Sequence, residues 1–365
     1  MTSNRPGTRL AVLLATWALG LSLGLGAPGA SAEPVSGAGS SAAAPVYRAW
    51  ASAYGQAQPG FQLAYQSVGS SAGLKAARAR SVGFGASDVA PPEKDLANDA
   101  LVLVPTFVTG AVPVINLPRV GNGKLRLSGD VLAAIFRGEI TRWNAPEIQS
   151  LNPGLALPDL PVRPVVRSDG SGTTYYFTDY LSKISPAWKE KSGAKTAIDW
   201  PASFMAAKGS DGVSRAVRDT AGAIGYIDFD YVTQDGLNPV QLRNAAGEFV
   251  TPGVDTFRAA LRGSEWYTSG NFHGSLANMP GFNAWPITMG TFILLPKVSD
   301  KPEEAARAIR FFVWALLKGD PVVEHMGFVR LPDKMQALAF KALTSVTNQS
   351  GQAIALEAMS EFSRP

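Results

Sequence analysis

Residues 167–174 read Arg-Ser-Asp-Gly-Ser-Gly-Thr-Thr, and a helical-looking run from Tyr175 to Leu181 follows at once. Glycines let the backbone turn its N–H groups towards a ligand, and the start of a helix adds a partial positive charge. Arg167 adds a bidentate donor, and the small hydroxyls add neutral ones. Since only Asp169 lacks a hydrogen to donate, the stretch predicts a site for a small oxyanion. The same residue types also form an ordinary helix cap.

Two further loops of small residues precede helix patterns. Residues 36–44 are all Ser, Gly or Ala, and Pro45 then suits the first turn of a helix. Residues 69–73 lead into a helix pattern over residues 74–79. Three helix starts that met at one point would bind an anion with their free backbone N–H groups.

Short strands are expected on both sides of the second loop, at residues 62–66 and 81–86. The order strand, helix, strand predicts a parallel pairing. In such sheets, ligands bind beyond the carboxyl ends of the strands, where Ser70 and Asp88 fall.

The rest of the chain continues the α/β pattern. Two apolar, Pro-interrupted strands are expected at residues 102–108 and 111–116, joined across a bend that is a candidate crossover between domains. Ser128 caps a helix predicted over residues 129–136. Further strands are expected at 162–166, 223–227 and 287–295, and an amphipathic helix is expected to begin at Pro302.

Composition narrows the functional classes. The chain has 365 residues, 46% of them hydrophobic and 17% charged, which is typical of a globular protein of about two domains. No run of Lys and Arg alternates with aromatic residues, which argues against nucleic-acid binding. There is no Cys, and the only histidines are His273 and His325, so we expect no disulfide, no metal and no cofactor.

The N-terminus has the form of a secretory signal peptide. Arg5 and Arg9 precede an apolar run, and the small residues Ala30-Ser31-Ala32 form a cleavage pattern before Glu33. The alternative is a membrane anchor, for which the apolar run is short. We therefore expect residues 1–32 to be removed, and the mature protein to act in the periplasm or to be secreted.

The 167–174 string is similar to the signature of the phosphate-binding proteins that serve high-affinity phosphate ABC importers. The resemblance spans almost the whole mature chain in the same order. Its other segments are Gly37-Ala38-Gly39 with Pro45-Val46-Tyr47, Tyr65-Gln66 with Gly69-Ser70-Ser71, Phe84-Gly85-Ala86-Ser87-Asp88, Gly222-Ala223-Ile224-Gly225-Tyr226 and Ala284-Trp285-Pro286-Ile287-Thr288.

The resemblance implies an α/β type II periplasmic binding protein fold, in which two lobes joined by a two-strand hinge close over a buried phosphate. Lobe I would comprise residues 33–107 and 253–365, and lobe II residues 108–252. The implied partner is the membrane permease of an ABC importer. The binding protein itself would be a monomer without enzymatic activity, and it would supply phosphate to that permease.

The resemblance also implies a ligand set. By position, the phosphate ligands would be Ser41, Ala42, Ser70, Asp88, Arg167, Ser171, Gly172 and Thr173, with Asp169 orienting the arginine. Ala42 stands where many members carry an aromatic residue, and Ala72 replaces a common glycine. Neither departure removes a charged group.

Asp88 offers a physical reason to select phosphate. A carboxylate repels an anion unless the ligand brings a proton, which phosphate keeps near neutral pH and sulfate does not. An unpaired buried charge opposite sulfate would cost about 3–5 kcal/mol. The alternative role for Asp88 is that of a helix cap or turn residue.

Two rival readings remain open. The same fold could bind another oxyanion or a phosphoester. Residues 69–73 also fit the G-x-S-x-G pattern of a secreted serine hydrolase, with both histidines later in the chain.

Overall fold

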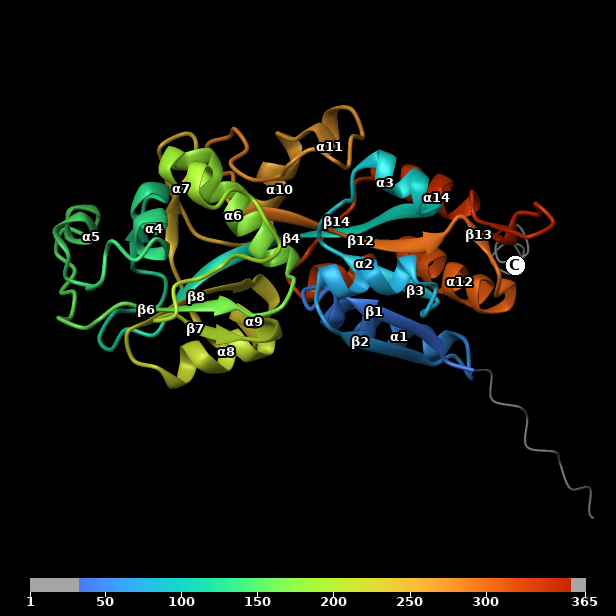
Figure 1. Ribbon diagram of the computed structural model, residues 1–365, viewed down its shortest axis with the longest axis horizontal. Coiled ribbons are helices and arrows are strands. Elements are labelled where there is room, and N and C mark those ends of the chain that lie inside the picture. Colours follow the sequence, from blue (N-terminus) through green and yellow to red (C-terminus); the bar gives the residue numbers. More distant parts are fainter. Residues whose placement is uncertain (1–32, 356–365) are drawn as a thin grey trace, which may run out of the picture. The chain divides into compact units, whose positions relative to one another are not determined.

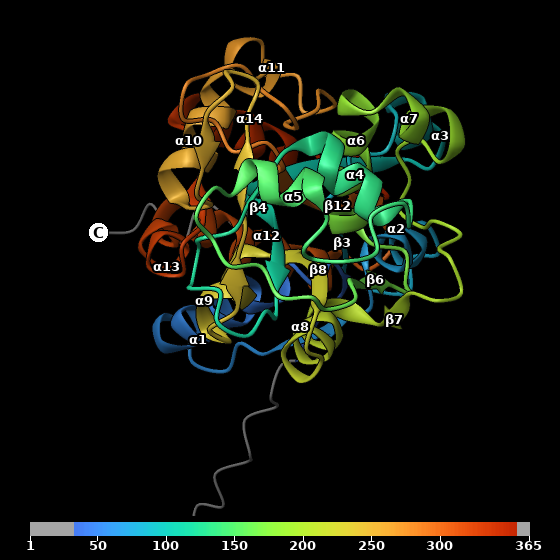
Figure 2. The ribbon, with the colours of Figure 1, turned by 90° about the vertical axis from the view of Figure 1, so that its left-hand side faces the viewer.

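The computed structural model describes residues 33–355, so the expected signal peptide at 1–32 lies outside the described residues. In the described part, helices cover a long mixed sheet, which confirms the predicted α/β class (Figures 1 and 2). The paired strands follow the order β2-β1-β3-β12-β4-β8-β6-β7, and β9 and β14 also pair with β4. Among residues 33–355, no helix is both long and apolar enough to cross a membrane.

The elements are as follows. The strands of the large sheet are β1 (Val35–Gly39), β2 (Leu63–Ser67), β3 (Phe84–Ser87), β4 (Leu101–Ile115), β6 (Arg163–Arg167), β7 (Met205–Ala207), β8 (Ala223–Asp228), β9 (Asn238–Pro239), β12 (Thr288–Pro296) and β14 (Val329–Arg330). The smaller sheets contain β5 (Arg126–Leu127), β10 (Gln241–Arg243) and β11 (Phe249–Val250), and β13 (Val298–Ser299) and β15 (Thr347–Asn348). The helices are α1 (Ala44–Ala57), α2 (Ser70–Arg78), α3 (Glu93–Asn98), α4 (Gly129–Phe136), α5 (Pro146–Leu151), α6 (Gly172–Ile184), α7 (Pro186–Lys191), α8 (Gly209–Asp219), α9 (Phe229–Gln234), α10 (Val254–Arg262), α11 (Glu265–Thr268), α12 (Pro302–Lys318), α13 (Asp320–His325) and α14 (Asp333–Thr344).

The first strands pair differently from the simplest expectation. The strands on either side of α2, β2 and β3, are indeed parallel, but β1 lies between them and pairs with both. Because the three strands are parallel, the carboxyl ends of β1 and β3 lie at the same end of the strands as the start of α2.

The strand β4 corrects the expectation of two strands joined across a bend. It is one continuous strand of 15 residues. Up to Gly110 it pairs with β12, and from Ala111 onward it pairs with β8, both antiparallel. Pro105 is tolerated inside the strand because the pairing with β12 shifts register opposite it, between Thr291 and Phe292.

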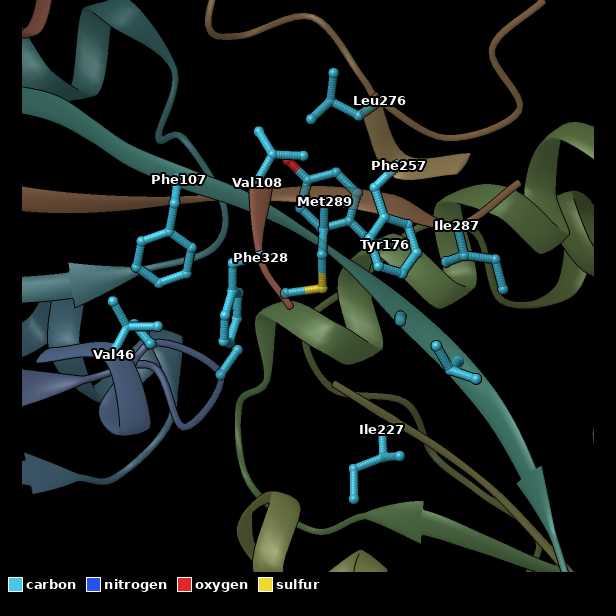
Figure 3. Packing of buried hydrophobic residues seen from close by; sticks show 14 of the residues in the cluster. Val46, Phe107, Val108, Tyr176, Ile227, Phe257, Leu276, Ile287, Met289 and Phe328 are labelled. Carbon is cyan, nitrogen blue, oxygen red and sulfur yellow. The ribbon is translucent and has the colours of Figure 1, made fainter. Parts of the chain in front are cut away.

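The hydrophobic core follows β4 on both sides of this change of partner. Phe107, Val108, Met289 and Phe328 belong to the same buried cluster as Ile227, which lies beyond the change (Figure 3). The core thus ties both parts of the sheet together.

Local signals for helices are confirmed. The helix α4 covers residues 129–136 as predicted, and Ser128 Oγ accepts a hydrogen bond from Val131 N. The helix α12 begins at Pro302 and buries the apolar face expected from its periodicity.

Candidate functional site

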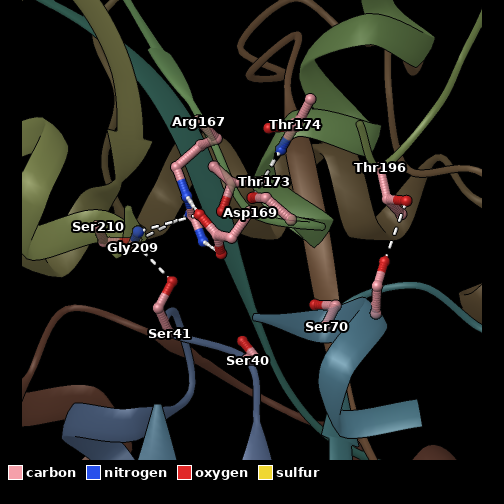
Figure 4. A network of polar contacts seen from close by, with 12 residues as sticks. Ser40, Ser41, Ser70, Arg167, Asp169, Thr173, Thr174, Thr196, Gly209 and Ser210 are labelled. Atoms are coloured by element: carbon pink, nitrogen blue, oxygen red, sulfur yellow. Dashed lines mark hydrogen bonds and ion pairs between the residues drawn. The ribbon is translucent and has the colours of Figure 1, made fainter. Parts of the chain in front are cut away.

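The ends of several strands and the starts of helices place a buried polar cluster between strands β1 and β3 on one side and strands β6 and β8 on the other (Figure 1). Ser40 and Ser41 follow β1, and Asp88 follows β3, while Ser70 begins α2. Arg167 ends β6, and the start of α6 follows a short loop further on (Figure 4). These polar side chains are at most 4% exposed.

Two serine hydroxyls hold the Asp88 carboxyl group. Ser70 Oγ donates to Asp88 Oδ2 at 3.0 Å and accepts from Asp88 N at 3.1 Å. Ser40 Oγ donates to Asp88 Oδ1 at 2.5 Å. Each carboxyl oxygen therefore has one donor from the protein and keeps capacity to accept another hydrogen bond.

Arg167 forms a bidentate ion pair with Asp169. Nε donates to Asp169 Oδ1 at 2.8 Å and Nη2 to Oδ2 at 2.6 Å, with the side chains 2% and 9% exposed. The N–H of Gly209 also donates to Oδ1. Burial opposes charge on both groups, yet their mutual bonds raise the pKa of Arg167 and lower that of Asp169, so both remain charged. The predicted orienting contact is thus present.

Asp228, at the end of β8, is a second buried carboxyl group that sequence reasoning missed. Thr173 Oγ1 donates to its Oδ1 at 2.9 Å, and Ser210 Oγ donates to its Oδ2 at 2.5 Å. Since the hydrogen of Ser210 goes to Asp228, Ser41 Oγ is the donor in its 2.9 Å contact with Ser210 Oγ. Because the hydroxyl of Thr173 already donates to Asp228, the groups that the start of α6 can offer a ligand are its free backbone N–H groups.

Gly170 and Gly172 let the loop before α6 and the first residue of this helix lie close to Ser71 and Asp88. A Cβ atom on Gly172 would lie 2.4 Å from Asp88 Cβ, and one on Gly170 would lie 2.4 Å from Ser71 Oγ. Both distances are too short for any side chain. Ser171 caps the helix, its Oγ accepting from Thr174 N at 3.1 Å.

Ser71 joins the start of α2 to the α6 loop rather than to a histidine. Its N–H donates to Gly170 O at 3.0 Å, and its Oγ donates to Thr196 Oγ1 at 3.1 Å. His273 Nε2 lies 3.8 Å from Glu93 Oε1. These contacts give the G-x-S-x-G stretch a role in holding two loops together, and the Ser71 hydroxyl donates to Thr196 rather than to a histidine, as a nucleophile would.

Burial shifts the pKa values of the two carboxyl groups of the cluster that do not belong to the Arg167–Asp169 pair. Burial raises the pKa of Asp88 to about 7, and repulsion from Asp228 adds to this, while Ser40, Ser70 and Arg167 oppose it. Burial likewise raises the pKa of Asp228. Asp88 thus changes charge near neutral pH.

The cluster brings together most of the predicted site residues. The contacts above link Ser70 and Gly172 to Asp88, and link Ser41 and Thr173 through Ser210 and Asp228. Arg167, paired with Asp169, joins them because its Nη1 donates to Ser210 Oγ at 3.5 Å. Ala42 is buried beside Ser41 and offers only its backbone. Sequence reasoning missed Ser40, Ser210 and Asp228, although Asp228 ends a buried strand much as Ser87-Asp88 does. Among residues 33–355, no three His, Cys, Asp or Glu side chains are grouped as a metal site requires.

Comparisons with known proteins show the family to which the chain belongs. A model described as a PBP superfamily domain matches residues 26–267. The phosphate-binding protein PstS of Pasteurella multocida is 38% identical over 94% of this chain and 97% of its own length. That of Haemophilus influenzae is 41% identical over 84% of this chain and 91% of its own length.

Comparison with solved structures also finds phosphate-binding proteins. The solved phosphate-binding protein from Stenotrophomonas maltophilia superposes with a TM-score of 0.66 at 20% identity, covering 88% of this chain and 98% of that one. The chain has the type II periplasmic binding protein fold and belongs to the PstS family of phosphate-binding proteins.

Proposed function

We propose that this chain binds inorganic phosphate outside the inner membrane and delivers it to the permease of an ABC importer. The observation that carries the proposal is that the Arg167–Asp169 pair, the start of α6 and the acceptor Asp88 lie together in a buried cluster. The names of the PstS relatives support the same ligand.

The proposed ligand groups are of two kinds. Donors are the guanidinium of Arg167, the hydroxyl of Ser171 and the backbone N–H groups of Ala42, Gly172 and Thr173. The hydroxyls of Ser41 and Ser70 would join them by turning from Ser210 and Asp88 towards the ligand. Asp88 is the acceptor for a proton that phosphate brings. Charge-assisted hydrogen bonds contribute about 1.5–3 kcal/mol each, so three to five reach the roughly 8 kcal/mol of micromolar binding.

Closure of two lobes would bury the ligand. We assign residues 33–107 and 253–365 to lobe I and residues 108–252 to lobe II. The partner change of β4 at Gly110 and Ala111 supports a hinge close to that boundary. The contacts of Ser71 with Gly170 and of Ser41 with Ser210 would then close the entrance.

The cellular setting follows from the proposed export. Removal of residues 1–32 would release a monomeric, non-enzymatic protein into the periplasm, as befits a carrier for a membrane permease. A solved structure of similar fold is described as a periplasmic phosphate-binding protein.

Calorimetry on protein freed of ligand by partial unfolding and refolding tests the proposal. We expect micromolar or tighter binding of phosphate, and phosphate in the protein as purified. Arg167→Ala should weaken the binding of phosphate and of sulfate alike. A refolded protein that binds no phosphate would rule the proposal out.

The alternative is that the same site binds a different oxyanion or a phosphoester. Competition of sulfate, molybdate and a phosphomonoester against phosphate decides between them. A tighter competitor than phosphate would replace it as the proposed ligand.

A further inference from the structure

Ser40 is held by hydrogen bonds at every polar group it has. Its N–H donates to Ala86 O at 3.1 Å, and its carbonyl accepts from Tyr65 OH at 2.8 Å. Its hydroxyl accepts from Ala43 N at 3.1 Å and donates to Asp88 Oδ1 at 2.5 Å. The side chain is buried, at 1% exposure for the residue.

These partners leave the Ser40 hydroxyl a single orientation. Because the N–H of Ala43 occupies the oxygen as an acceptor, the hydroxyl hydrogen points elsewhere, and Asp88 Oδ1 lies within reach. Ser40 is therefore a fixed donor to the carboxyl group that we propose accepts the proton of phosphate. A donor to a carboxylate favours its charged form.

We propose that Ser40 is a specificity-determining positioning residue, whose hydroxyl keeps Asp88 an acceptor and thereby sets the pH range over which sulfate is excluded. The inference rests on the proposed function. This role depends on one buried hydroxyl, one buried carboxyl group and a ligand that differs from its competitor by one proton.

The other groups facing Asp88 do not replace this contact. Ser70 donates to the opposite oxygen, Oδ2. Asp228 repels a charge on Asp88, and Arg167 attracts it but is already paired with Asp169. Tyr47, Tyr65 and Tyr176 also sense Asp88, and burial raises the pKa of each, so they stay neutral near pH 7.

Sulfate and phosphate should respond differently to the charge of Asp88, because they differ in the protons they carry. Sulfate brings no proton, so it binds well only when Asp88 is protonated, and its affinity falls about tenfold per pH unit above the pKa of Asp88. Phosphate carries its own proton and escapes this penalty. Loss of the Ser40 donor should move the sulfate profile to higher pH by about one unit, the worth of one charge-assisted hydrogen bond.

The test is calorimetric titration of Ser40→Ala and of the unsubstituted protein with sulfate and with phosphate, from pH 5.5 to 9. We expect Ser40→Ala to bind sulfate about fivefold more tightly at pH 8, nearly tenfold more tightly at pH 9 and equally at pH 5.5, with a smaller change for phosphate. Ser128→Ala, which removes the cap of α4 by the same substitution, is the control and should follow the unsubstituted protein.

Two further measurements separate this role from a structural one. In an Asp88→Asn background, Ser40→Ala should no longer move the sulfate profile, because no titrating group remains. If sulfate binds too weakly to titrate, carbon-13 NMR of the Asp88 carboxyl group should show a higher pKa in Ser40→Ala. An unmoved pKa, or a loss of affinity by the same factor at every pH, would overturn the role of Ser40. Absence of phosphate binding by the unsubstituted protein would instead overturn the proposed function.

Discussion

Gly172 lies against Asp88 so closely that a Cβ atom on the glycine would be 2.4 Å from Asp88 Cβ and 2.7 Å from Ser70 Oγ. The contact joins the start of α6 to the end of β3. No backbone strain is involved; the requirement is for space, and it falls at the point where the proposed ligand is enclosed.

Gly172→Ala should therefore impair ligand enclosure. We expect the affinity for phosphate, measured by calorimetry, to fall at least about a hundredfold, because the start of α6 must move away from Asp88 and loses its donors to the ligand. Gly212→Ala is the matched control, since a Cβ there, inside α8, meets its nearest neighbour at an ordinary 3.6 Å. The control should keep its affinity; equal affinities for the two variants would refute the role of the close contact.

Asp88→Asn should relax selectivity more than it weakens phosphate binding. An amide can donate to sulfate, which removes the cost of protonating Asp88 above its pKa of about 7, a factor of about ten in sulfate affinity at pH 8. The ratio of phosphate to sulfate affinity at pH 8 is the measurement, and Asp169→Asn, in the same cluster, shows what loss of a different carboxylate does. Continued strong rejection of sulfate by Asp88→Asn would mean that another group carries the discrimination.

Asp228→Asn should change the pKa of Asp88 in the direction opposite to Ser40→Ala. Repulsion from Asp228 helps to raise the pKa of Asp88, so its removal should lower that pKa and extend the exclusion of sulfate to lower pH. Carbon-13 NMR of the Asp88 carboxyl group measures the shift. Asp230→Asn is the control, because its carboxylate accepts hydrogen bonds from Gln234 and should leave the pKa of Asp88 unchanged.

The stability of the ligand-free protein should fall as pH rises. The pKa of Asp88 is raised from 3.8 to about 7, so between these values the folded state binds more protons than the unfolded state, and stability is lost as pH increases through this window. The contribution of Asp88 is at most about 4 kcal/mol of the free energy of unfolding. Urea unfolding at pH 5 and pH 8 should show the loss, and Asp88→Asn should reduce it. The same slope in both proteins would assign it to other groups.

Much of the fold followed from local signals. Ser128 and the apolar periodicity after it located α4 correctly, since a cap and a periodic face are properties of neighbouring residues. Whether residues 102–116 form one strand or two depends on partners far away in the chain. The continuous β4 needs β12 and β8 beside it, and no local pattern contains them.

The site residues divide in the same way, into those that local sequence indicates and those that only tertiary packing brings together. Arg167 and Asp169 lie two residues apart, and their pairing could be expected from the sequence. Asp228, Ser210 and Ser40 reach the cluster only through the packing of strand ends and helix starts. A rule that treats each polar residue at the end of a buried strand as a candidate would have found Asp228.

The long strand β4 has a thermodynamic consequence. One half of β4 is hydrogen-bonded to β12 and the other half to β8. Unfolding of the strands on either side would remove backbone partners from β4, so we expect both sides to unfold together. Melting followed by scanning calorimetry should therefore give a single cooperative endotherm whose van't Hoff and calorimetric enthalpies agree.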